Sequence, residues 1–510
     1  MLTRLKVSGF KNLVDVDIRF GPFTCIAGPN GVGKSNLFDA ILFLSALADH
    51  PLMTAAQSVR GDENGARMSD IRSLFHRCGD EYASEMSFEA EMIIPSEGED
   101  DLGDKAKATI TFLRYSLRLA YKREENPGST GSLKVLHEDL NYIKVGDATK
   151  HLLFPHESEW QKTAIHGRRS GKQFISTEET GGRTVIKLHQ DGGIRGKPLS
   201  TKAAKSLPRT VLCAANTAES STALLARREM RSWRLLQLEP SAMRRPDEFS
   251  APTRLGADGS NLAATLYRLA YQNGSRAKDV GDPNVCAQVA NRLAQLIDDV
   301  RKVSIDHDEK RDLLTLNVMA ADRTPHAARS LSDGTLRFLA LAVLEQDPEF
   351  QGVLCLEEPE NGIHPARIPA MIKLLQDITT DVSEPVDSDN PLRQVIVNTH
   401  SPAVVLQVPQ DTLLVAEPRE AISSEGQRFT GVRFSCLPDT WRAGKSQERV
   451  DTCKLGALLA YLNPVLPSEY SMVEEETPAS VSRSKKRPVP PKRVIDRPDV
   501  QSYFPWFKTQ

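Results

Sequence analysis

The fold is decided by Gly28-Pro29-Asn30-Gly31-Val32-Gly33-Lys34-Ser35, which fits the pattern GxxxxGK(S/T). A short apolar stretch, residues 23–27, precedes it, and a run with helical apolar spacing, residues 36–47, follows it. A phosphate-binding loop needs this order, because glycines let backbone N–H groups face phosphate oxygens and the following helix adds its positive N-terminal end. The sequence therefore predicts a strand, a phosphate-binding loop and a helix.

This loop predicts a site for ATP and Mg²⁺. The lysine of such a loop reaches the β- and γ-phosphates, and the hydroxyl that follows it binds the metal. We assign these roles to Lys34 and Ser35. The nucleotide contacts expected here are Gly28, Pro29, Asn30, Gly31, Val32, Gly33, Lys34, Ser35 and Asn36.

Two carboxylates follow an apolar strand about 300 residues later. Glu357 and Glu358 come directly after the strand-like run Val353–Leu356, at the edge where α/β sheets bind their ligands. One carboxylate can bind Mg²⁺, and the other can polarise an attacking water. Alone, a Glu-Glu pair after an apolar run is more often a solvated turn, so the assignment depends on its neighbours.

Further motifs flank this pair. Ser330–Thr335 precedes a strongly apolar helix, for which Ser332 is a good N-cap. Residues 359–365 read Pro-Glu-Asn-Gly-Ile-His-Pro, and a second apolar strand, residues 394–397, leads into Asn398-Thr399-His400-Ser401-Pro402. The carboxylate pair is thus one of several motifs in a fixed order, which favours the functional interpretation.

Composition limits the remaining function classes. The chain has 510 residues, of which 40% are hydrophobic, and 65 basic residues nearly cancel 67 acidic ones. These values exclude a wholly disordered chain and a polycation. No apolar run of about 18 residues and no signal-peptide core is present, so we expect a cytoplasmic protein without membrane contact. The seven scattered cysteines, without a CxxC pair, argue against a disulfide framework and a zinc cluster.

The other segments predict a β-rich region, an insertion and a tail. Residues 86–94 and 109–121 alternate like an antiparallel hairpin, with an acidic loop at 97–104. Residues 161–209 are rich in Gly, Ser, Thr and Lys and are interpreted as an irregular basic insertion. Beyond Pro464 the chain becomes Pro/Ser-rich, with six basic residues between Arg483 and Arg493, as in a linker or tail.

Helices are expected at 255–271 and 285–299, and a strand at 312–319. No internal repeat is visible, and no heptad pattern persists for the three or four heptads of a coiled coil.

In their order, these motifs resemble the ABC-type ATPase head of the SMC/RecF/OLD group, also described as AAA-21 or AAA-15 ATPases. The resemblance implies that Leu331–Thr335 is the signature and Glu357 the Walker B metal ligand. It also implies that Glu358 is the catalytic base, Asn361 lies in the D-loop and His400 is the switch histidine that senses the γ-phosphate. Lys34, Glu358 and His400 are thus the expected catalytic residues.

Two such heads dimerise head to tail in this family, so the resemblance implies that Ser332, Asp333 and Gly334 contact the ATP of a second chain. Two positions depart from the pattern. Glu357 replaces the usual aspartate, and Asp333 places a negative charge where the common signature has its first glycine. Both changes predict slow turnover, because Glu357 reaches the metal through water and Asp333 is unfavourable beside a triphosphate unless it points away.

The resemblance also implies the architecture. We expect an α/β head with a mixed central sheet flanked by helices, an antiparallel β-rich subdomain, an inserted segment and no long coiled coil. Residues 1–125 and 251–420 form the two parts of the head, residues 126–250 the basic insertion or subdomain, and residues 421–510 the C-terminal extension and tail.

Three family elements are weak or missing. Gly9–Asn12 resembles the N-terminal strand motif, in which Phe10 is a core residue and Lys11 approaches nucleotide or nucleic acid. The alternative is that this motif has only a structural role. No Q-loop glutamine is identifiable between residues 40 and 87. OLD proteins carry a Toprim nuclease domain after the ATPase. Only about 110 residues follow His400 here, without the Asp-x-Asp of that domain, so we expect no nuclease in this chain.

Two functions fit the resemblance. Stand-alone heads resemble ATPase subunits of bacterial anti-phage systems of the Septu type, which predicts a slow, dimeric or higher-order ATPase that regulates a partner effector, such as a nuclease encoded nearby. The alternative is a RecF-like DNA-repair clamp. Residues 161–209 and the cluster Arg227, Arg228, Arg231 and Arg234 would then contact DNA or RNA phosphates, although solvated basic faces are equally compatible.

Overall fold

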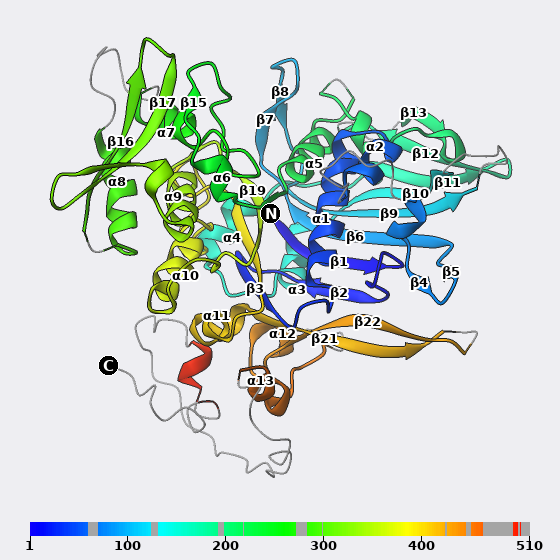
Figure 1. Ribbon diagram of the computed structural model, residues 1–510. Helices are drawn as coiled ribbons and strands as arrows, with labels where there is room; N and C mark the ends of the chain where they lie inside the picture. The colour runs from blue at the N-terminus through cyan, green and yellow to red at the C-terminus, as the bar shows by residue number, and fades with distance from the viewer. Residues whose placement is uncertain are drawn as a thin grey trace.

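A six-stranded sheet carries the phosphate-binding loop in the computed structural model (Figure 1). Its strand order is β14 (Arg234–Leu236), β19 (Gly352–Glu357), β20 (Arg393–Thr399), β3 (Phe23–Ala27), β21 (Leu413–Ile422) and β22 (Arg428–Cys436). The first five strands are parallel, and β22 is antiparallel to β21. Buried parallel strands are continuous apolar runs, and β3, β19 and β20 are buried along almost their whole length.

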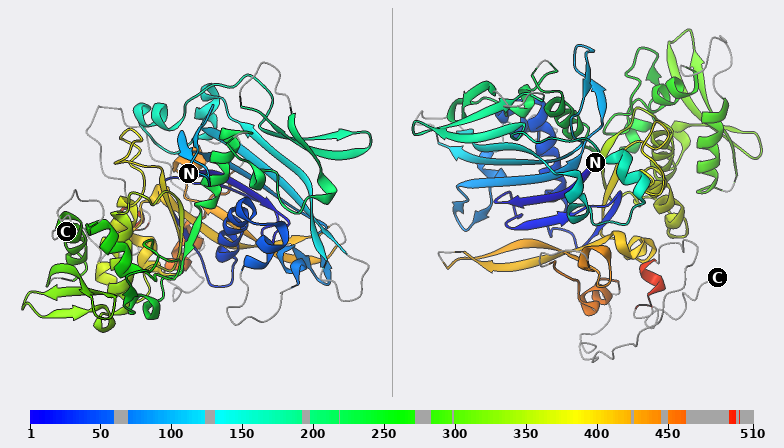
Figure 2. Two further views of the ribbon diagram at one scale, coloured as in Figure 1. Left: turned by 90° about the horizontal axis from the view of Figure 1, so that it is seen from above. Right: turned by 180° about the vertical axis from the view of Figure 1, so that it is seen from behind.

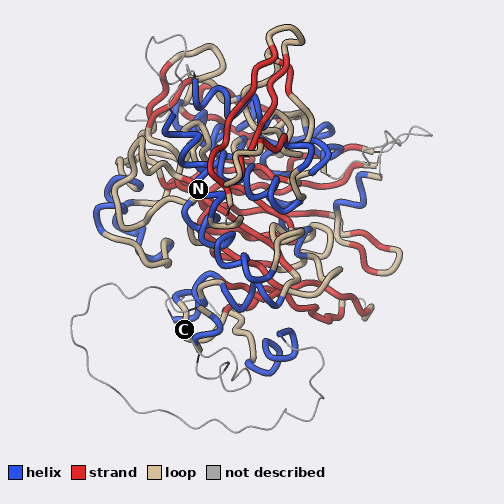
Figure 3. The backbone as a smooth tube through the Cα atoms, turned by 60° about the vertical axis from the view of Figure 1, so that its left-hand side comes forward, coloured by secondary structure: helices blue, strands red, loops and turns tan. Residues whose placement is uncertain are grey.

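The structure describes residues 1–59, 70–123, 131–191, 198–217, 219–271, 283–297, 299–423, 426–444, 450–462, 493–497 and 500. Helices and strands are interspersed throughout this part, so the expected α/β class is confirmed (Figure 3). Its longest helix, α1 (Lys34–Asp49), has 16 residues, and no long coiled coil is seen in the described residues. Within them, no helix is long and apolar enough to cross a membrane.

An eight-stranded antiparallel sheet forms the second layer (Figure 1). Its order is β13 (Pro198–Ala203), β12 (Arg183–His189), β11 (Ile175–Thr180), β10 (Ser132–Tyr142), β9 (Phe112–Lys122), β6 (Glu85–Ile93), β1 (Leu2–Ser8) and β2 (Val16–Arg19). Strands β6 and β9 pair antiparallel from Glu85 opposite Ala120 to Ile93 opposite Phe112. The hairpin predicted from the alternating pattern is thereby confirmed.

Two expectations about the intervening segments were wrong. The basic segment 161–209 is not irregular throughout, because β11, β12 and β13 extend the large sheet outward from β10 and bury Ile175, Ile186 and Leu188. The acidic stretch after residue 96 is not a simple loop, because β7 (Glu97–Glu99) and β8 (Lys105–Lys107) form a two-stranded ribbon.

The tip of this ribbon contacts two arginines of the cluster on and after α5 (Ser221–Arg231). Arg227 and Arg231 both form ion pairs with Asp101 at the tip. Arg234 is largely buried with its guanidinium 4.6 Å from the Phe350 ring, and this burial lowers its pKa to about 10. Three of the four arginines thus have intramolecular partners, and phosphate binding by this cluster stays a prediction.

Helix α1 shares one core with the eight-stranded sheet, with α2 (Leu52–Ser58) and α5, and with one face of the six-stranded sheet (Figure 2). Helices α9 (Asp333–Glu345), α10 (Ile368–Asp377) and α11 (Pro402–Gln407) pack in the core on the other face of that sheet. The phosphate-binding loop therefore joins a strand and a helix that are both buried.

A small sheet and two helices stand beside this core (Figure 1). The sheet contains β15 (Asp247–Glu248), β17 (Leu313–Ala320), β16 (Val300–Asp308) and β18 (Pro325–Ala327), and the helices are α7 (Leu262–Tyr271) and α8 (Pro283–Ala294). The predicted helices and strand are confirmed, but α8 ends at Ala294 instead of residue 299, and α7 begins only at Leu262. A turn closed by the Gly256 N–H and the Ser260 carbonyl, 2.9 Å apart, occupies the residues before it.

The remaining described elements are short. They are β4 (Arg77–Cys78), β5 (Glu81–Tyr82), α3 (Ala148–His151), α4 (Ser158–Ala164), α6 (Pro240–Met243), α12 (Trp441–Gly444) and α13 (Leu455–Leu462). Most of the expected tail lies outside the described residues. Its segment Val494–Asp496 is a 3₁₀ turn that packs beside α11, where the Val494 N–H donates to the Val408 carbonyl at 3.2 Å.

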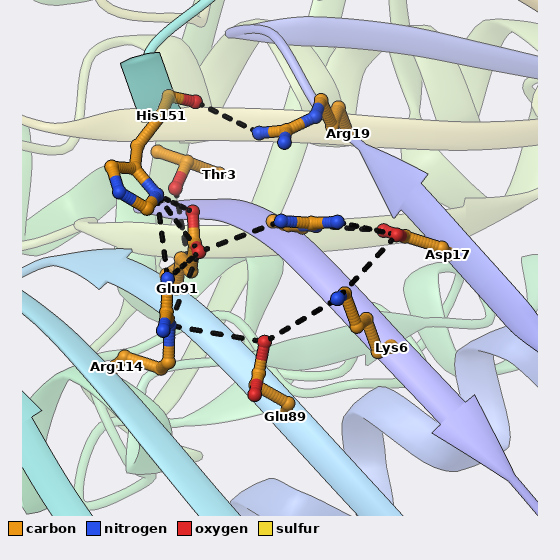
Figure 4. A network of polar contacts seen from close by, with 9 residues as sticks. Thr3, Lys6, Asp17, Arg19, Glu89, Glu91, Arg114 and His151 are labelled. Carbon is orange, nitrogen blue, oxygen red and sulfur yellow. Dashed lines mark hydrogen bonds and ion pairs between the residues drawn. The ribbon is translucent and has the colours of Figure 1, made fainter. Parts of the chain in front are cut away.

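A polar network joins four strands of the large sheet (Figure 4). Glu91 of β6 is completely buried and accepts hydrogen bonds from Arg114 Nη2 at 2.8 Å and His151 Nδ1 at 3.0 Å. Arg4 of β1 lies 3.8 Å from the same carboxylate and donates to Asp17 of β2 at 2.8 Å. Burial alone would raise the pKa of Glu91, but the contacts with His151 and Arg114 hold it at about 2.

Replacing Glu91 with glutamine is expected to lower the free energy of unfolding at pH 7 by roughly 3 kcal/mol, because Arg4 and Arg114 each lose the nearby charge of a buried carboxylate. The folded pKa is depressed from 4.5 to about 2. The stabilisation is therefore present above the unfolded pKa and is lost as the pH falls from there toward 2. Urea unfolding across this pH range measures both effects.

The matched control is Glu89→Gln. Glu89 lies at the more exposed end of the network, 3.9 Å from Lys6 and 3.8 Å from Arg114, so its loss is expected to cost less than about 1 kcal/mol. A Glu91→Gln chain with the parent's stability and acid sensitivity would show that the network does not stabilise the sheet.

Candidate nucleotide-binding site

A cavity of about 660 Å³ opens at the carboxyl edge of the six-stranded sheet. Its wall combines the phosphate-binding loop, the residues after β14 and β19, and one side of α9. The lining residues are Asn30, Gly31, Gly33, Lys34, Ser35, Asn36, Leu236, Gln237, Leu238, Glu239, Arg337, Leu341, Leu356, Glu357, Glu358, Pro359, Asn361 and Asn398. The structure thus brings together the loop and the carboxylates that the sequence places 300 residues apart.

The shape of the loop depends on two glycines. Gly31 and Gly33 have φ of 78° and 110°, in the region that favours glycine. A Cβ on Gly33 would also lie 2.2 Å from the side chain of Asn12. The loop therefore keeps its path only with glycine at residue 33.

Lys34 lies inside this loop. Its Nζ donates to the Gly28 carbonyl at 2.6 Å and to the Pro29 carbonyl at 3.0 Å, and the residue is only 6% exposed. Burial lowers the pKa of Lys34, while the nearby carboxylates Glu358 and Glu357 act in the opposite direction. A partly desolvated ammonium held among carbonyls is well placed to receive a phosphate oxygen.

The N-terminal motif, Gly9–Asn12, contacts the end of the phosphate-binding loop through Asn12. Phe10 is a fully buried core residue, as expected. Lys11 does not line the cavity and instead forms an ion pair with buried Asp39 of α1 at 2.7 Å. Asn12, whose role the sequence did not indicate, donates to the Val32 carbonyl at 2.9 Å and accepts from Asn36 Nδ2 at 2.8 Å. Asn12 therefore links the two ends of the loop's last turn.

Glu357 and Glu358 leave the end of β19 in different environments. Glu357 is the last residue of the strand, opposite Asn398 of β20, whose Nδ2 lies 3.4 Å from its Oε1. Glu358 has a left-handed backbone with φ of 46°, which is uncommon outside glycine. Its N–H donates to the Asn398 carbonyl at 3.0 Å, which helps to hold this conformation.

Both carboxylate oxygens of Glu358 are engaged. His400 Nδ1 lies 2.6 Å from Oε1, and Asn361 Nδ2 donates to Oε2 at 2.9 Å. Partial burial would raise the pKa of Glu358, but these hydrogen bonds and the charge of Lys34 hold it below its ordinary value. Glu358 is therefore an ionised hydrogen-bond acceptor at neutral pH, beside the two residues expected to act with it.

Gln237 is a cavity residue that the sequence motifs did not predict. It directly follows the three-residue strand β14, which lies next to β19 in the sheet, and it lines the cavity. The region in which a Q-loop glutamine was sought, residues 40–87, contributes none of its described residues, 40–59 and 70–87, to the cavity lining. The strand order supplies the missing signal, because residues after adjacent parallel strands meet at one edge.

The signature residues Ser332, Asp333 and Gly334 lie outside the lining of the cavity of their own chain. Ser332 caps α9 by accepting from the Thr335 N–H, as predicted, and both Ser332 and Asp333 are exposed. Gly334 is buried, and a Cβ there would lie 2.1 Å from the carbonyl oxygen of Gly362. None of these three residues lines the cavity in the described structure.

Arg337, one turn further along α9, connects the signature helix to two other segments. It donates to the Asn361 carbonyl at 2.7 Å and to the Leu238 carbonyl at 3.2 Å. The segment after β14, the signature helix and the turn after β19 are thus joined through one guanidinium at the wall of the cavity.

Comparisons with known proteins agree with this geometry. A family model described as "AAA domain, putative AbiEii toxin, Type IV TA system" matches residues 216–406, and one described as "AAA domain" matches residues 4–130. Relatives include the DNA replication and repair protein RecF of Paenarthrobacter aurescens, 38% identical over 60 residues, and the OLD nuclease of Thermus scotoductus, 51% identical over 41 residues. The chain is similar to ABC-type ATPases of the SMC/RecF/OLD group.

The matches to this ATPase head are local. The RecF alignment covers 12% of the chain and 15% of the relative, and the OLD alignment covers 8% of each. RecF of Clavibacter sepedonicus is 34% identical over 87 residues, which is 17% of the chain and 21% of the relative. The chain thus spans about a fifth or less of these relatives.

Solved SMC heads align over more of the ATPase head. One, bound to the C-winged helix domain of ScpA, covers 86% of this chain and 98% of its own, with 15% identity and a TM-score of 0.43. The SMC head from Thermotoga maritima covers 84% and 97%, with 14% identity and a TM-score of 0.35.

The cavity offers a fitting set of groups for Mg²⁺ with a nucleotide. Among the described residues, no group of three or more His, Cys, Asp or Glu is arranged to hold a metal ion. Mg²⁺ at phosphate sites is usually held by one or two protein oxygens together with phosphates and waters. The Ser35 hydroxyl and the Glu357 carboxylate line one cavity and suit that arrangement.

Proposed function

We propose that the chain binds MgATP in this cavity and hydrolyses it. The observation that carries the proposal is the meeting of Lys34, Glu357 and Glu358 in one cavity, after the parallel strands β3 and β19 that flank β20. Lys34 and the loop N–H groups bind the phosphates, while Ser35 and Glu357 hold Mg²⁺, which neutralises phosphate charge.

Glu358 acts as the base in this proposal. It is an ionised carboxylate at the cavity wall, so it can orient the attacking water and accept its proton. His400, hydrogen-bonded to Glu358, senses the γ-phosphate, and Gln237 occupies the position of the Q-loop glutamine. Turnover is slow, because both oxygens of Glu358 are engaged by His400 and Asn361 until the site rearranges.

The complete site needs two chains. Ser332, Asp333 and Gly334 belong to the signature but do not line the cavity of their own chain. In the proposed head-to-tail dimer, the exposed signature turn of one chain covers the ATP that is bound by the other chain. Asn361 lies in the D-loop, where the two chains meet. A helix N-terminus capped by Ser332 offers N–H groups to the γ-phosphate.

The role we favour is control of a partner effector, such as a nuclease, in bacterial anti-phage defence of the Septu type. Two similarities support it: the short match to an OLD nuclease, and the family description that names a putative AbiEii toxin of a type IV toxin–antitoxin system. In this role, ATP-driven closure of the dimer would switch the effector bound to it.

A RecF-like clamp on DNA is the second candidate, and the RecF matches favour it equally. In a clamp, Arg227 and Arg231 would exchange their ion pairs with partly exposed Asp101 for contacts with DNA or RNA phosphates.

Phosphate release by the purified chain tests the proposed activity. We expect slow, Mg²⁺-dependent hydrolysis of ATP that EDTA abolishes, and no hydrolysis at any ATP concentration would contradict the proposal. ATP-stimulated duplex binding that weakens steeply with salt would favour the clamp. ATP-dependent co-purification with the product of an adjacent gene would favour the effector role.

A further inference from the structure

The signature turn, Leu331–Thr335, carries a negative charge at its centre. Asp333 is the first residue of α9, its side chain is 53% exposed, and Ser332 beside it is exposed as well. A carboxylate here stabilises the helix N-terminus, but it repels any anion that approaches the same N–H groups. A turn that meets a triphosphate therefore needs a compensating positive charge.

Arg244 supplies such a charge. It follows the short helix α6, in the segment that leaves the cavity after Glu239, and it forms an ion pair with Asp333. The same Nη2 donates to the Leu331 carbonyl at 3.1 Å. One guanidinium thus holds both the charged side chain and the backbone of the signature turn.

We propose that Arg244 is a positioning residue that neutralises Asp333 and turns its carboxylate aside, so that the signature turn can meet a triphosphate. This inference rests on the proposed function, since it needs the signature of one chain to meet the ATP of another. It explains how an aspartate is tolerated where related heads have glycine. Arg244 acts through Asp333 and need not touch ATP itself.

Stability alone does not explain the pair. Both side chains are partly exposed, 34% for Arg244 and 53% for Asp333, and exposed ion pairs contribute little to folding. The inference therefore predicts that the two residues depend on each other in ATP-driven assembly, while the fold of each single variant is preserved.

The test measures the ATP concentration for half-maximal dimerisation, by light scattering, in chains that carry Glu358→Gln to prevent hydrolysis. In this background, Arg244→Ala is expected to raise that concentration at least tenfold, while ATP affinity of the isolated chain at low protein concentration changes less than twofold. Asp333→Gly is expected to dimerise at least as readily as the parent. Asp333→Gly should also rescue Arg244→Ala to within about threefold of Asp333→Gly alone.

Arg254→Ala is the matched control. Arg254 also forms an exposed ion pair, with Glu349 at 2.8 Å, but it has no contact with the signature turn, so its loss should leave dimerisation unchanged. Rescue by Asp333→Gly cannot arise from a merely structural role of Arg244, because that role would be lost in the double variant as well.

Two results would overturn the inference alone: an Arg244→Ala chain that dimerises like its parent, or a double variant that remains as defective as Arg244→Ala. A Glu358→Gln parent that binds ATP but stays a single chain would overturn the proposed dimer, and this inference with it.

Discussion

Replacing Lys34 with alanine is expected to weaken ATP binding by at least about 100-fold, which corresponds to roughly 3 kcal/mol of lost charge-assisted hydrogen bonding. The ammonium lies inside the loop between the Gly28 and Pro29 carbonyls. Among the described residues, Arg337 is the other cation that lines the cavity. Titration with a fluorescent ATP analogue measures the loss, and phosphate release should disappear with it.

Lys11→Ala is the matched control for this variant. Lys11 is a nearby lysine whose Nζ pairs with buried Asp39, outside the cavity lining. Its loss should lower the stability of the fold, because buried Asp39 loses the positive charge of Lys11, but should affect ATP affinity much less. Equal affinity in the parent and the Lys34→Ala chain would show that the cavity is not the nucleotide site.

Replacing Glu358 with glutamine is expected to reduce hydrolysis by about 10²–10⁴-fold while ATP binding is kept. Glutamine keeps the size of the side chain and can still contact His400 and Asn361, but it cannot accept a proton from water. Single-turnover phosphate release, measured beside ATP binding on the same sample, separates the chemical step from binding.

Glu360→Gln is the comparison for the base. Glu360 is also a glutamate after β19, but it is 7% exposed, accepts from Thr399 Oγ1 and does not line the cavity. Burial raises the pKa of Glu360, so it is less suited to be an ionised base. Normal hydrolysis in Glu358→Gln, or a larger loss in Glu360→Gln, would move the assignment away from Glu358.

The parts of the site that local sequence could predict are those with a chemical pattern in a single stretch. The loop at Lys34, the carboxylates after β19 and the histidine after β20 each follow an apolar strand, and parallel strands must bring such residues to one edge. The hairpin of β6 and β9 in the large sheet followed from alternating side chains in the same way.

Other parts depend on which segments meet in space. Gln237 is a single polar residue after a three-residue strand, and its importance appears only when β14 is seen beside β19. Strands β11 and β12 contain few apolar residues, so their sequence looks irregular until β10 provides a partner. The Arg244–Asp333 pair joins residues 89 positions apart, a distance at which no local pattern signals a contact.

The central claim is that ATP joins two chains through the cavity of one and the signature of the other. The most direct measurement is the mass of the Glu358→Gln chain by light scattering, with and without MgATP. We expect twice the mass of one chain with MgATP. When Lys34→Ala is added to Glu358→Gln, we expect the mass of one chain again. A mass of one chain at saturating ATP, in a sample shown to bind the nucleotide, would contradict it.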